Sequence, residues 1–187
     1  MGKIVVTEFM SLDGVIDEPR WTFGFNRGPD GDKFKFDELF AADAMLLGRV
    51  TYQGFAQAWP SYTDEEGFAD RMNSMPRYVV SNTLADADAT WGPATVIRGD
   101  VPAELTRLRK EFDGTLLVHG SVQLTHALIE HGLVDEYHLM VFPIILGAGK
   151  RFAPDTLAEG AKLALSSAKA ASDGIQMLIY TPAQAGE

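Results

Sequence analysis

The pattern of hydrophobic and polar positions changes about two thirds of the way along the chain. Before that point, short apolar runs typical of buried strands alternate with stretches whose apolar residues recur every three or four positions, as on one face of a helix. The predicted strands are 3–9, 44–47, 77–81, 95–97 and 115–118, and the predicted helices are 32–42, 52–58, 102–112 and one through Leu124 that ends at Gly132. Beyond Gly132 the pattern predicts strands alone, at 135–142, 162–168 and 175–181.

This order of elements predicts an α/β fold with one mixed sheet. Strands separated by helices pair in parallel, whereas strands that follow one another directly pair antiparallel. We therefore expect a mainly parallel sheet with antiparallel C-terminal strands. The chain has no long linker, low-complexity tract or internal repeat, which indicates a single domain over 1–187. The Gly- and Pro-bearing segment 17–31 is predicted to be a long loop of the kind that covers a site.

Charge and composition exclude several partners and chemistries. The formal net charge of −10 opposes nucleic acid and anionic membrane surfaces as main partners. The chain has no cysteine, which excludes disulfides and thiolate chemistry and suits a reducing compartment. Glu8 interrupts the first apolar run, which is not the pattern of a signal peptide, and no stretch approaches the ~20 apolar residues of a membrane span. We expect a cytoplasmic protein.

Two turns share one construction, in which a buried strand is followed by a glycine and then by a helix N-terminus. Gly48 precedes Arg49 and Thr51, and Gly120 precedes Ser121. A helix N-terminus offers unpaired N–H groups and partial positive charge, and a glycine lets a ligand approach the backbone. The turns are therefore candidates for a phosphate site, to which Arg49 adds a permanent cation. The alternative is that the glycines only permit tight turns and that the hydroxyl side chains cap their helices.

Sequence signatures of other enzyme classes are absent. The segment 147–149 does not continue as the G-x-G-x-x-G motif, and Gly149-Lys150 is not part of a phosphate-binding P-loop. No serine stands in G-x-S-x-G, and no H-E-x-x-H occurs. The four histidines are not spaced as metal ligands, so we predict structural or surface roles for them and no metal site.

Six short blocks of sequence are specific in combination. They are LDG at 12–14, LGRVTY at 47–52, YVVSNTL at 78–84, HGSVQL at 119–124, LVDE at 133–136 and PIILGAGKRF at 143–152. In this order they resemble the family named for the C-terminal reductase domain of the bifunctional riboflavin deaminase–reductase. The resemblance implies the dihydrofolate-reductase-like fold, a three-layer α/β sandwich, and the cofactor NADPH.

The resemblance also implies which residues bind NADPH. They are Gly48, Arg49, Thr51, Ser81, Asn82, Gly120, Ser121 and Val122. Arg49 and Thr51 would contact the diphosphate. The pair at the end of the third strand would lie beside the adenosine ribose and its 2′-phosphate, and the last three would line the other side of the diphosphate.

The activity implied is that of an NADPH-dependent oxidoreductase that transfers a hydride to a flat, dihydrofolate- or pterin-like heterocycle. Two features separate this chain from the riboflavin enzyme: it has no zinc deaminase domain, and 53–60 reads QGFAQAWP where pyrimidine reductases have an Asp–Asn–Pro-type block. One alternative is still a reductase of 5-amino-6-ribosylamino-pyrimidinone in riboflavin biosynthesis. Another is a protein that binds NADPH without catalysis. The apolar segments 139–145 and 175–179 and the resemblance predict a homodimer.

Reduction of a C=N bond also needs a proton donor and a wall for the substrate. Dihydrofolate reductases place an acid at the start of the helix before the Gly-Arg turn, and counting back from Gly48 brings Asp32 there. Asp32 could instead cap the predicted helix. Asp13, whose loop would border the nicotinamide, is the second candidate. Candidates for the substrate wall, or for ordinary packing, are Trp21, Phe25 and Phe36.

Overall fold

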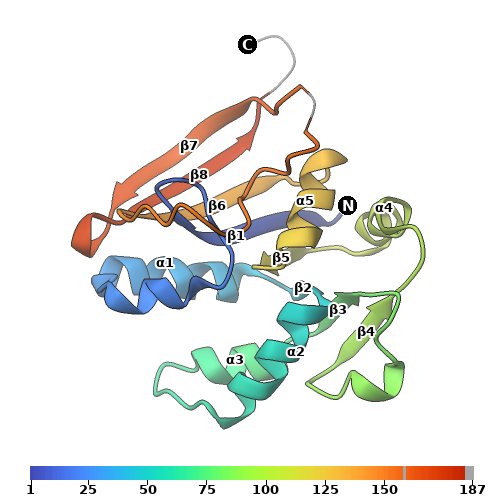
Figure 1. Ribbon diagram of the computed structural model, residues 1–187. Coiled ribbons are helices and arrows are strands. Elements are labelled where there is room, and N and C mark those ends of the chain that lie inside the picture. Colours follow the sequence, from blue (N-terminus) through green and yellow to red (C-terminus); the bar gives the residue numbers. More distant parts are fainter. Residues whose placement is uncertain (158, 184–187) are drawn as a thin grey trace.

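The computed structural model describes residues 1–157 and 159–183. Within these ranges the chain forms an eight-stranded sheet in the order β4-β3-β2-β5-β1-β6-β8-β7 (Figure 1). The strands are β1 Lys3–Ser11, β2 Ala44–Gly48, β3 Arg77–Val80, β4 Ala94–Ile97, β5 Thr115–His119, β6 Glu136–Phe142, β7 Leu163–Ala170 and β8 Gln176–Pro182. The α-helices are α1 Gly28–Ala41, α2 Arg49–Ala58, α3 Phe68–Ser74, α4 Val101–Glu111 and α5 Val122–Glu130.

The strand directions confirm the predicted mixed sheet. Every pair from β4 across to β6 is parallel, whereas β8 is antiparallel to β6 and β7 is antiparallel to β8. The parallel part coincides with the region in which helices return the chain between strands. The antiparallel part coincides with the C-terminal run of strands without α-helices: β7 and β8 form a hairpin, and β8 lies between β7 and β6 in the sheet.

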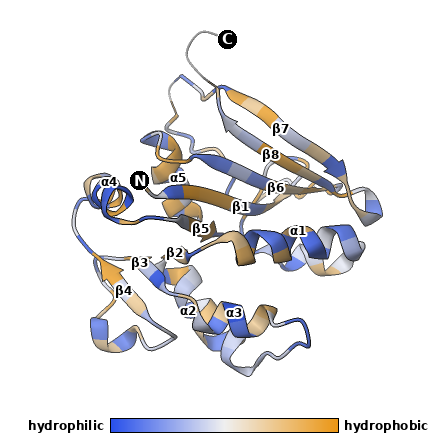
Figure 2. Cartoon of the chain, turned by 180° about the vertical axis from the view of Figure 1, so that it is seen from behind, coloured by the Kyte–Doolittle hydropathy of each residue, from blue (hydrophilic) through white to orange (hydrophobic). Residues whose placement is uncertain are grey.

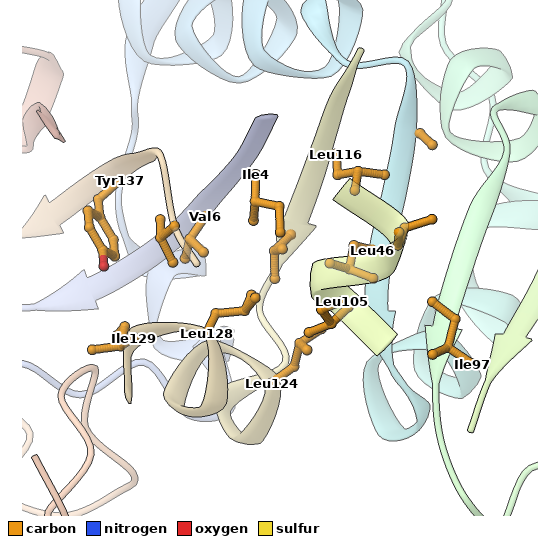
Figure 3. Close-up of a cluster of buried hydrophobic side chains, with 14 of the residues drawn as sticks. Ile4, Val6, Leu46, Ile97, Leu105, Leu116, Leu124, Leu128, Ile129 and Tyr137 are labelled. Carbon is orange, nitrogen blue, oxygen red and sulfur yellow. The ribbon is translucent and has the colours of Figure 1, made fainter. Parts of the chain in front are cut away.

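Alternate residues of the central strands pack into two separate hydrophobic cores. Ile4 and Leu116 pack with α4 and α5 on one face of the sheet, as Figure 3 shows, and Val5 and Leu117 pack with α1, α2 and α3 on the other. Figure 2 shows the same layering: the hydrophobic (orange) part of β1 lies between helices that carry hydrophilic (blue) residues. The result is the predicted three-layer sandwich.

None of the helices in the described ranges is long and apolar enough to cross a membrane.

Two segments differ from the prediction. α1 begins at Gly28, a turn earlier than Asp32, and the predicted loop 17–31 is correspondingly shorter and contains a 3-10 turn at Pro19–Gly24. Pro29 lies in the first turn of α1, where a residue without an N–H group costs no hydrogen bond. The helix α3 was not predicted, because its seven residues are too few to show a period.

The strands β1 and β5 end at different places, and this difference leaves one side of β1 unpaired at the edge of the sheet. Their ladder stops at the pair formed by Thr7 and His119, whereas β1 continues against β6 as far as Ser11. The two strands are parallel, so both carboxyl ends point toward the same edge of the sheet. β1 therefore projects past β5 there, with one side no longer covered by its neighbour.

Candidate active site

A cleft with a volume of about 1880 Å³ lies at the carboxyl ends of the parallel strands. Thr7 and Glu8 of β1 and His119 of β5 line it where β5 stops. The segment before α1 and α1 itself contribute one wall, and the N-termini of α2 and α5 contribute another. Ligands of open α/β sheets bind in crevices at this edge. The predicted covering segment thus lies beside the cleft, although it is shorter than expected.

Ser121 connects the two strand–glycine–helix turns. Its hydroxyl accepts a hydrogen bond from the Gly48 N–H at 2.9 Å and donates one to the His119 carbonyl at 3.2 Å. Gly120 and Ser121 both have positive φ, at 55° and 64°, which is uncommon for a residue with a side chain. Such strained positions persist where the surrounding structure fixes them. Here the strained serine holds the N-terminus of α5 beside that of α2.

Neither of these helix N-termini is capped by a side chain. The N-cap residues are Gly48 for α2 and Ser121 for α5, and neither accepts a hydrogen bond from the first turn through a side chain. The capping alternative is therefore wrong for Ser121, whose hydroxyl is bonded to Gly48, and for Thr51, which lies inside α2. The first-turn N–H groups of two adjacent helices are left for an anion, which is the donor set that a dinucleotide diphosphate needs.

The residues predicted to bind the cofactor come from three separate segments of the chain, and all of them line the cleft. They are Gly48, Arg49, Thr51, Ser81, Asn82, Gly120, Ser121 and Val122. Hydrogen bonds fix the turn after β3. The Ser81 hydroxyl accepts from the Thr83 and Leu84 N–H groups at 3.1 and 2.9 Å, and the Asn82 amide oxygen accepts from the Gly99 N–H at 2.7 Å.

Arg49 differs from the other cations of the cleft. Five cationic side chains line it, and four of them pair with carboxylates at 2.6 to 3.8 Å: Arg27 with Asp32, Lys33 with Asp37, Lys35 with Glu38 and Lys150 with Asp17. Arg49 donates to the amide oxygen of Gln53 at 3.0 Å and has no carboxylate partner in the described part of the chain. Its full charge is available to a phosphate.

Asp32 lies in the second turn of α1 and lines the cleft. Because the helix begins at Gly28, Asp32 is not its N-cap, and the capping alternative for this residue is wrong. Its side chain is 61% exposed and pairs with Arg27 at 2.9 Å. The carboxylate is thus at the solvent side of the cleft, where water surrounds it.

Asp13 has a different position and does not line the cleft. Its carboxylate accepts hydrogen bonds from the Ser11 hydroxyl at 2.7 Å and from the Leu146 and Gly147 N–H groups at 3.1 and 2.8 Å. These bonds, with that of Ser11 strongest, lower the pKa of Asp13 to about 2. Asp13 is therefore a carboxylate at neutral pH and joins two loops.

The aromatic residues predicted for the substrate wall separate into two groups. Trp21 and Phe25 pack edge-on against Phe142 at 5.5 and 5.4 Å and do not line the cleft. Phe36 does line it. Six further aromatic side chains that line the cleft were missed by the sequence analysis: Phe9, Phe23, Phe55, Trp59, Tyr62 and Phe68. The last four come from α2, from the following 3-10 turn and its C-cap, and from α3, which only the fold brings next to α1.

The sequence analysis also missed Glu8 as a site residue. It is 3% exposed and lines the cleft, and Thr125 of α5 lies 3.1 Å from its carboxyl. Burial raises the pKa of Glu8 to about 8, against the opposing effects of Thr125 and Lys35. A signal was present in the sequence, because Glu8 is the charge that interrupts the first apolar run.

His119 lines the cleft from β5, and its ring contacts that of Phe55 at 6.2 Å. Burial lowers the pKa of His119 to about 3, so the imidazole is neutral. Its Nε2 atom is buried and has no hydrogen-bond partner within the described ranges. A buried polar atom without a partner at the edge of a cleft fits a site that a polar ligand completes.

On the α1 face of the sheet, a chain of polar contacts runs from the cleft toward the surface. Lys35 donates to the Thr7 hydroxyl at 2.7 Å and pairs with Glu38 at 2.6 Å, and Glu38 contacts His138 at 3.1 Å. Burial opposes the ionisation of Glu38, but Lys35 and His138 together hold its pKa below the usual range.

The described residues contain no cluster of three or more His, Asp or Glu side chains that could hold a metal ion.

The mixed sheet with helices on both faces is a fold of the dihydrofolate-reductase-like class. Residues 2–177 match the family described as the RibD C-terminal domain, and the chain belongs to that family, as the sequence blocks indicated. A curated relative, the uncharacterized protein YyaP of Bacillus subtilis (strain 168), is 26% identical over 185 residues, which cover 95% of this chain and 94% of YyaP.

Two solved structures show the same fold. A protein of Shewanella sp. PV-4 that is provisionally assigned to riboflavin biosynthesis superimposes with a TM-score of 0.78 at 19% identity and covers 97% of this chain and 99% of its own. Dihydrofolate reductase from Enterococcus faecalis, complexed with NADP(H) and RAB-propyl, superimposes with a TM-score of 0.61 at 13% identity over 97% of each chain. At these identities the likeness concerns the fold.

The burial of Glu8 predicts a specific pH dependence of stability. In the unfolded chain the carboxyl ionises near 4.5, the ordinary pKa of a glutamate, and in the folded protein near 8. Between these values the folded state retains a proton that the unfolded state has lost, so the free energy of unfolding falls as the pH rises, by at most about 1.4 kcal/mol per pH unit. Glu8→Gln removes this component, and urea unfolding of both proteins from pH 5 to pH 9 measures it. Parallel curves for the two proteins would contradict the buried acid.

Proposed function

We propose that this protein is an NADPH-dependent reductase. The observation that carries the proposal is the pair of uncapped helix N-termini held together by Ser121, with Arg49 beside them. Membership of the RibD C-terminal domain family supports a reductase, and a structural neighbour of the same fold was solved with NADP(H). NADPH would supply the hydride, and the residues of this chain would bind and orient the two reactants.

The cofactor-binding residues divide between two parts of the dinucleotide. Gly48, Arg49 and Thr51 would hold the diphosphate from the α2 side, and Gly120–Val122 would hold it from the α5 side. Ser81 and Asn82, in the turn after β3, would lie beside the adenosine ribose and its 2′-phosphate. The nicotinamide end of the cofactor would then lie toward β1 and α1, because in the strand order the turns after β2 and β5 lie between β3 and β1.

A flat heterocycle of the dihydrofolate or pterin type is the substrate class that the aromatic wall favours. Phe36, Phe55 and Trp59 offer aromatic faces for a planar ring. The cations at the α1 end are already paired with carboxylates, so they offer no unpaired charge to a substrate phosphate. Asp32 is the acid that the sequence analysis predicts for proton transfer in this part of the cleft, and this role stays a prediction.

The second candidate is reduction of 5-amino-6-ribosylamino-pyrimidinone, the riboflavin precursor. Family membership and the Shewanella neighbour favour it. A panel of pterins, pyrimidines with and without phosphate, and small carbonyl compounds separates the candidates when the loss of NADPH absorbance is followed. We expect turnover with an unphosphorylated heterocycle. Turnover confined to the phosphorylated pyrimidine would support the riboflavin role, and NADPH binding without any turnover would support a non-catalytic protein.

Arg49→Ala should weaken NADPH binding by about 10- to 100-fold, because a charge-assisted hydrogen bond contributes about 1.5–3 kcal/mol. Titration of cofactor fluorescence measures the affinity. Arg107→Ala is the matched control, since Arg107 is an exposed arginine on α4, bonded to Glu104 and Glu111 and outside the cleft. Equal affinity of the wild type and Arg49→Ala would remove the diphosphate assignment.

We also propose a homodimer in the cytoplasm. Most of the apolar side chains at 139–145 and 175–179 pack inside the protomer, among them Leu139, Phe142 and Met177. Ile145, in the loop after β6, is 73% exposed, and Leu165, on the edge strand β7, is 56% exposed. Light scattering at micromolar concentration should give about twice the 20.4 kDa mass of one chain. A mass of 20.4 kDa would rule the dimer out, and Leu165→Lys tests whether this surface is the interface.

A further inference from the structure

Glu8 stands at the place where the core of the sheet meets the cleft. Thr7 is the last residue of β1 that pairs with β5, so Glu8 is the first whose side toward β5 is uncovered. On its other side it pairs with Leu139 of β6. Its side chain lies on the α5 face of the sheet, where it contacts Thr125. A carboxyl group is thereby fixed in a nearly dry position that still borders the cleft.

Thr125 is the hydrogen-bond partner of the Glu8 carboxyl. The Thr125 hydroxyl lies 3.1 Å from Glu8 Oε1 and 3.1 Å from the carbonyl oxygen of Gly120. A hydroxyl has one proton, and a carbonyl can only accept. Thr125 is the donor in both contacts, so its single proton is shared between the Glu8 carboxyl and the Gly120 carbonyl.

The surroundings of Glu8 agree with a neutral acid. Thr125 approaches it from α5, the ammonium of Lys35 acts on it from α1, and Leu139 covers it from β6. His119, on β5, is uncharged because burial lowers its pKa. Thr125 and Lys35 favour the carboxylate, and the charge of Lys35 is balanced by Glu38 at 2.6 Å. Burial therefore dominates and raises the pKa of Glu8 to about 8.

We propose that Glu8 is the catalytic acid of this cleft and delivers the proton that accompanies hydride transfer. This inference rests on the proposed reductase function and adds a residue to it. No other described residue bonds to the Glu8 carboxyl apart from Thr125, so its second oxygen is open to a ligand in the cleft. A general acid works best when its pKa lies near the working pH, because it then holds a proton and still releases it readily.

The step balances in protons and electrons. The substrate C=N bond receives a hydride from the reduced nicotinamide at carbon, which forms a C–H bond and leaves the oxidised nicotinamide. The electron pair of the C=N π bond moves to nitrogen and takes the proton of Glu8, so the O–H bond breaks and an N–H bond forms. Glu8 is left as a carboxylate and regains a proton from water in the open cleft before the next turnover.

Asp32 and Asp13 are less suited to this step. Asp32 is 61% exposed and paired with Arg27, so its carboxylate lies at the solvent side of the cleft. Asp13 has a pKa of about 2, lowered first by the Ser11 hydroxyl, and lies outside the cleft lining. Glu8 is the carboxyl that combines burial with access to the ligand.

The ionisation of Glu8 can be measured on the free protein without any substrate. Carboxyl ¹³C NMR of protein labelled at glutamate, followed from pH 4 to pH 10, should show one resonance with a midpoint near 8 that is missing in Glu8→Gln. Glu65→Gln is the matched control, because Glu65 is exposed and outside the cleft. A Glu8 midpoint below about 6, close to ordinary glutamate values, would overturn the proposal.

The role in turnover is tested with the substrate that the panel identifies. Glu8→Gln keeps the shape and an acceptor for Thr125 but cannot release a proton, so kcat should fall by about 100-fold or more while the Kd for NADPH stays within about twofold. Turnover of the wild type and of Glu65→Gln should fall as the pH rises past about 8, because the acid is then ionised. Wild-type turnover in Glu8→Gln, or a collapse confined to Asp32→Asn, would overturn the assignment.

Failure of the proposed reductase function and failure of the Glu8 assignment give different experimental results. If the wild type binds no NADPH, the proposed function fails and the role of Glu8 fails with it, whatever the NMR titration gives. If the wild type binds NADPH and transfers hydride while Glu8→Gln does so equally well, the reductase stands and the catalytic acid is another group.

Discussion

The ladder between β1 and β5 stops at Thr7 and His119 while β1 continues against β6, and the arrangement of the cleft follows from this difference in length. A strand with one uncovered side at the carboxyl edge of a parallel sheet gives a ligand access to the centre of the fold. The same edge carries the turns after β2 and β5, so the two helix N-termini point into the space that the shorter strand leaves. The hydrogen bond between Gly48 and Ser121 then fixes the distance between those helices.

Polar groups are buried on both faces of the sheet at this position. Thr7, Lys35 and Glu38 form a paired set on the α1 face, whereas Glu8 on the α5 face has Thr125 and no cation in direct contact among the described residues. Burying a charge is costly unless it is paired, so the paired set stays ionised and the unpaired acid stays protonated. Thr7 and Glu8 thus face different electrostatic surroundings, because the side chains of neighbouring strand residues alternate between the two faces of the sheet.

The sequence by itself determined the fold class, because the periods of its apolar positions report directly on local structure. Alternating strands and helices up to Gly132, followed by strands alone, predicted the mixed sheet and its antiparallel end. Glycines before two helix N-termini, with Arg49 after the first, indicated a phosphate site, and six short blocks identified the family. Local signals also produced the errors: Pro29 was interpreted as part of a loop although it lies in the first turn of α1, and α3 has too few residues to show a period.

Only the tertiary structure decided which polar groups share an environment, because protonation and access depend on neighbours that are far apart in the sequence. Glu8 looked like a charge that interrupts an apolar run, yet the strand offset and Thr125, 117 positions away, make it a buried acid at the cleft. Asp13 looked like a candidate acid, yet the loop at 146–147 binds its carboxylate. The Ser121 hydroxyl could have capped a helix, and its bond to Gly48 became visible only when β2 and β5 were adjacent in the sheet.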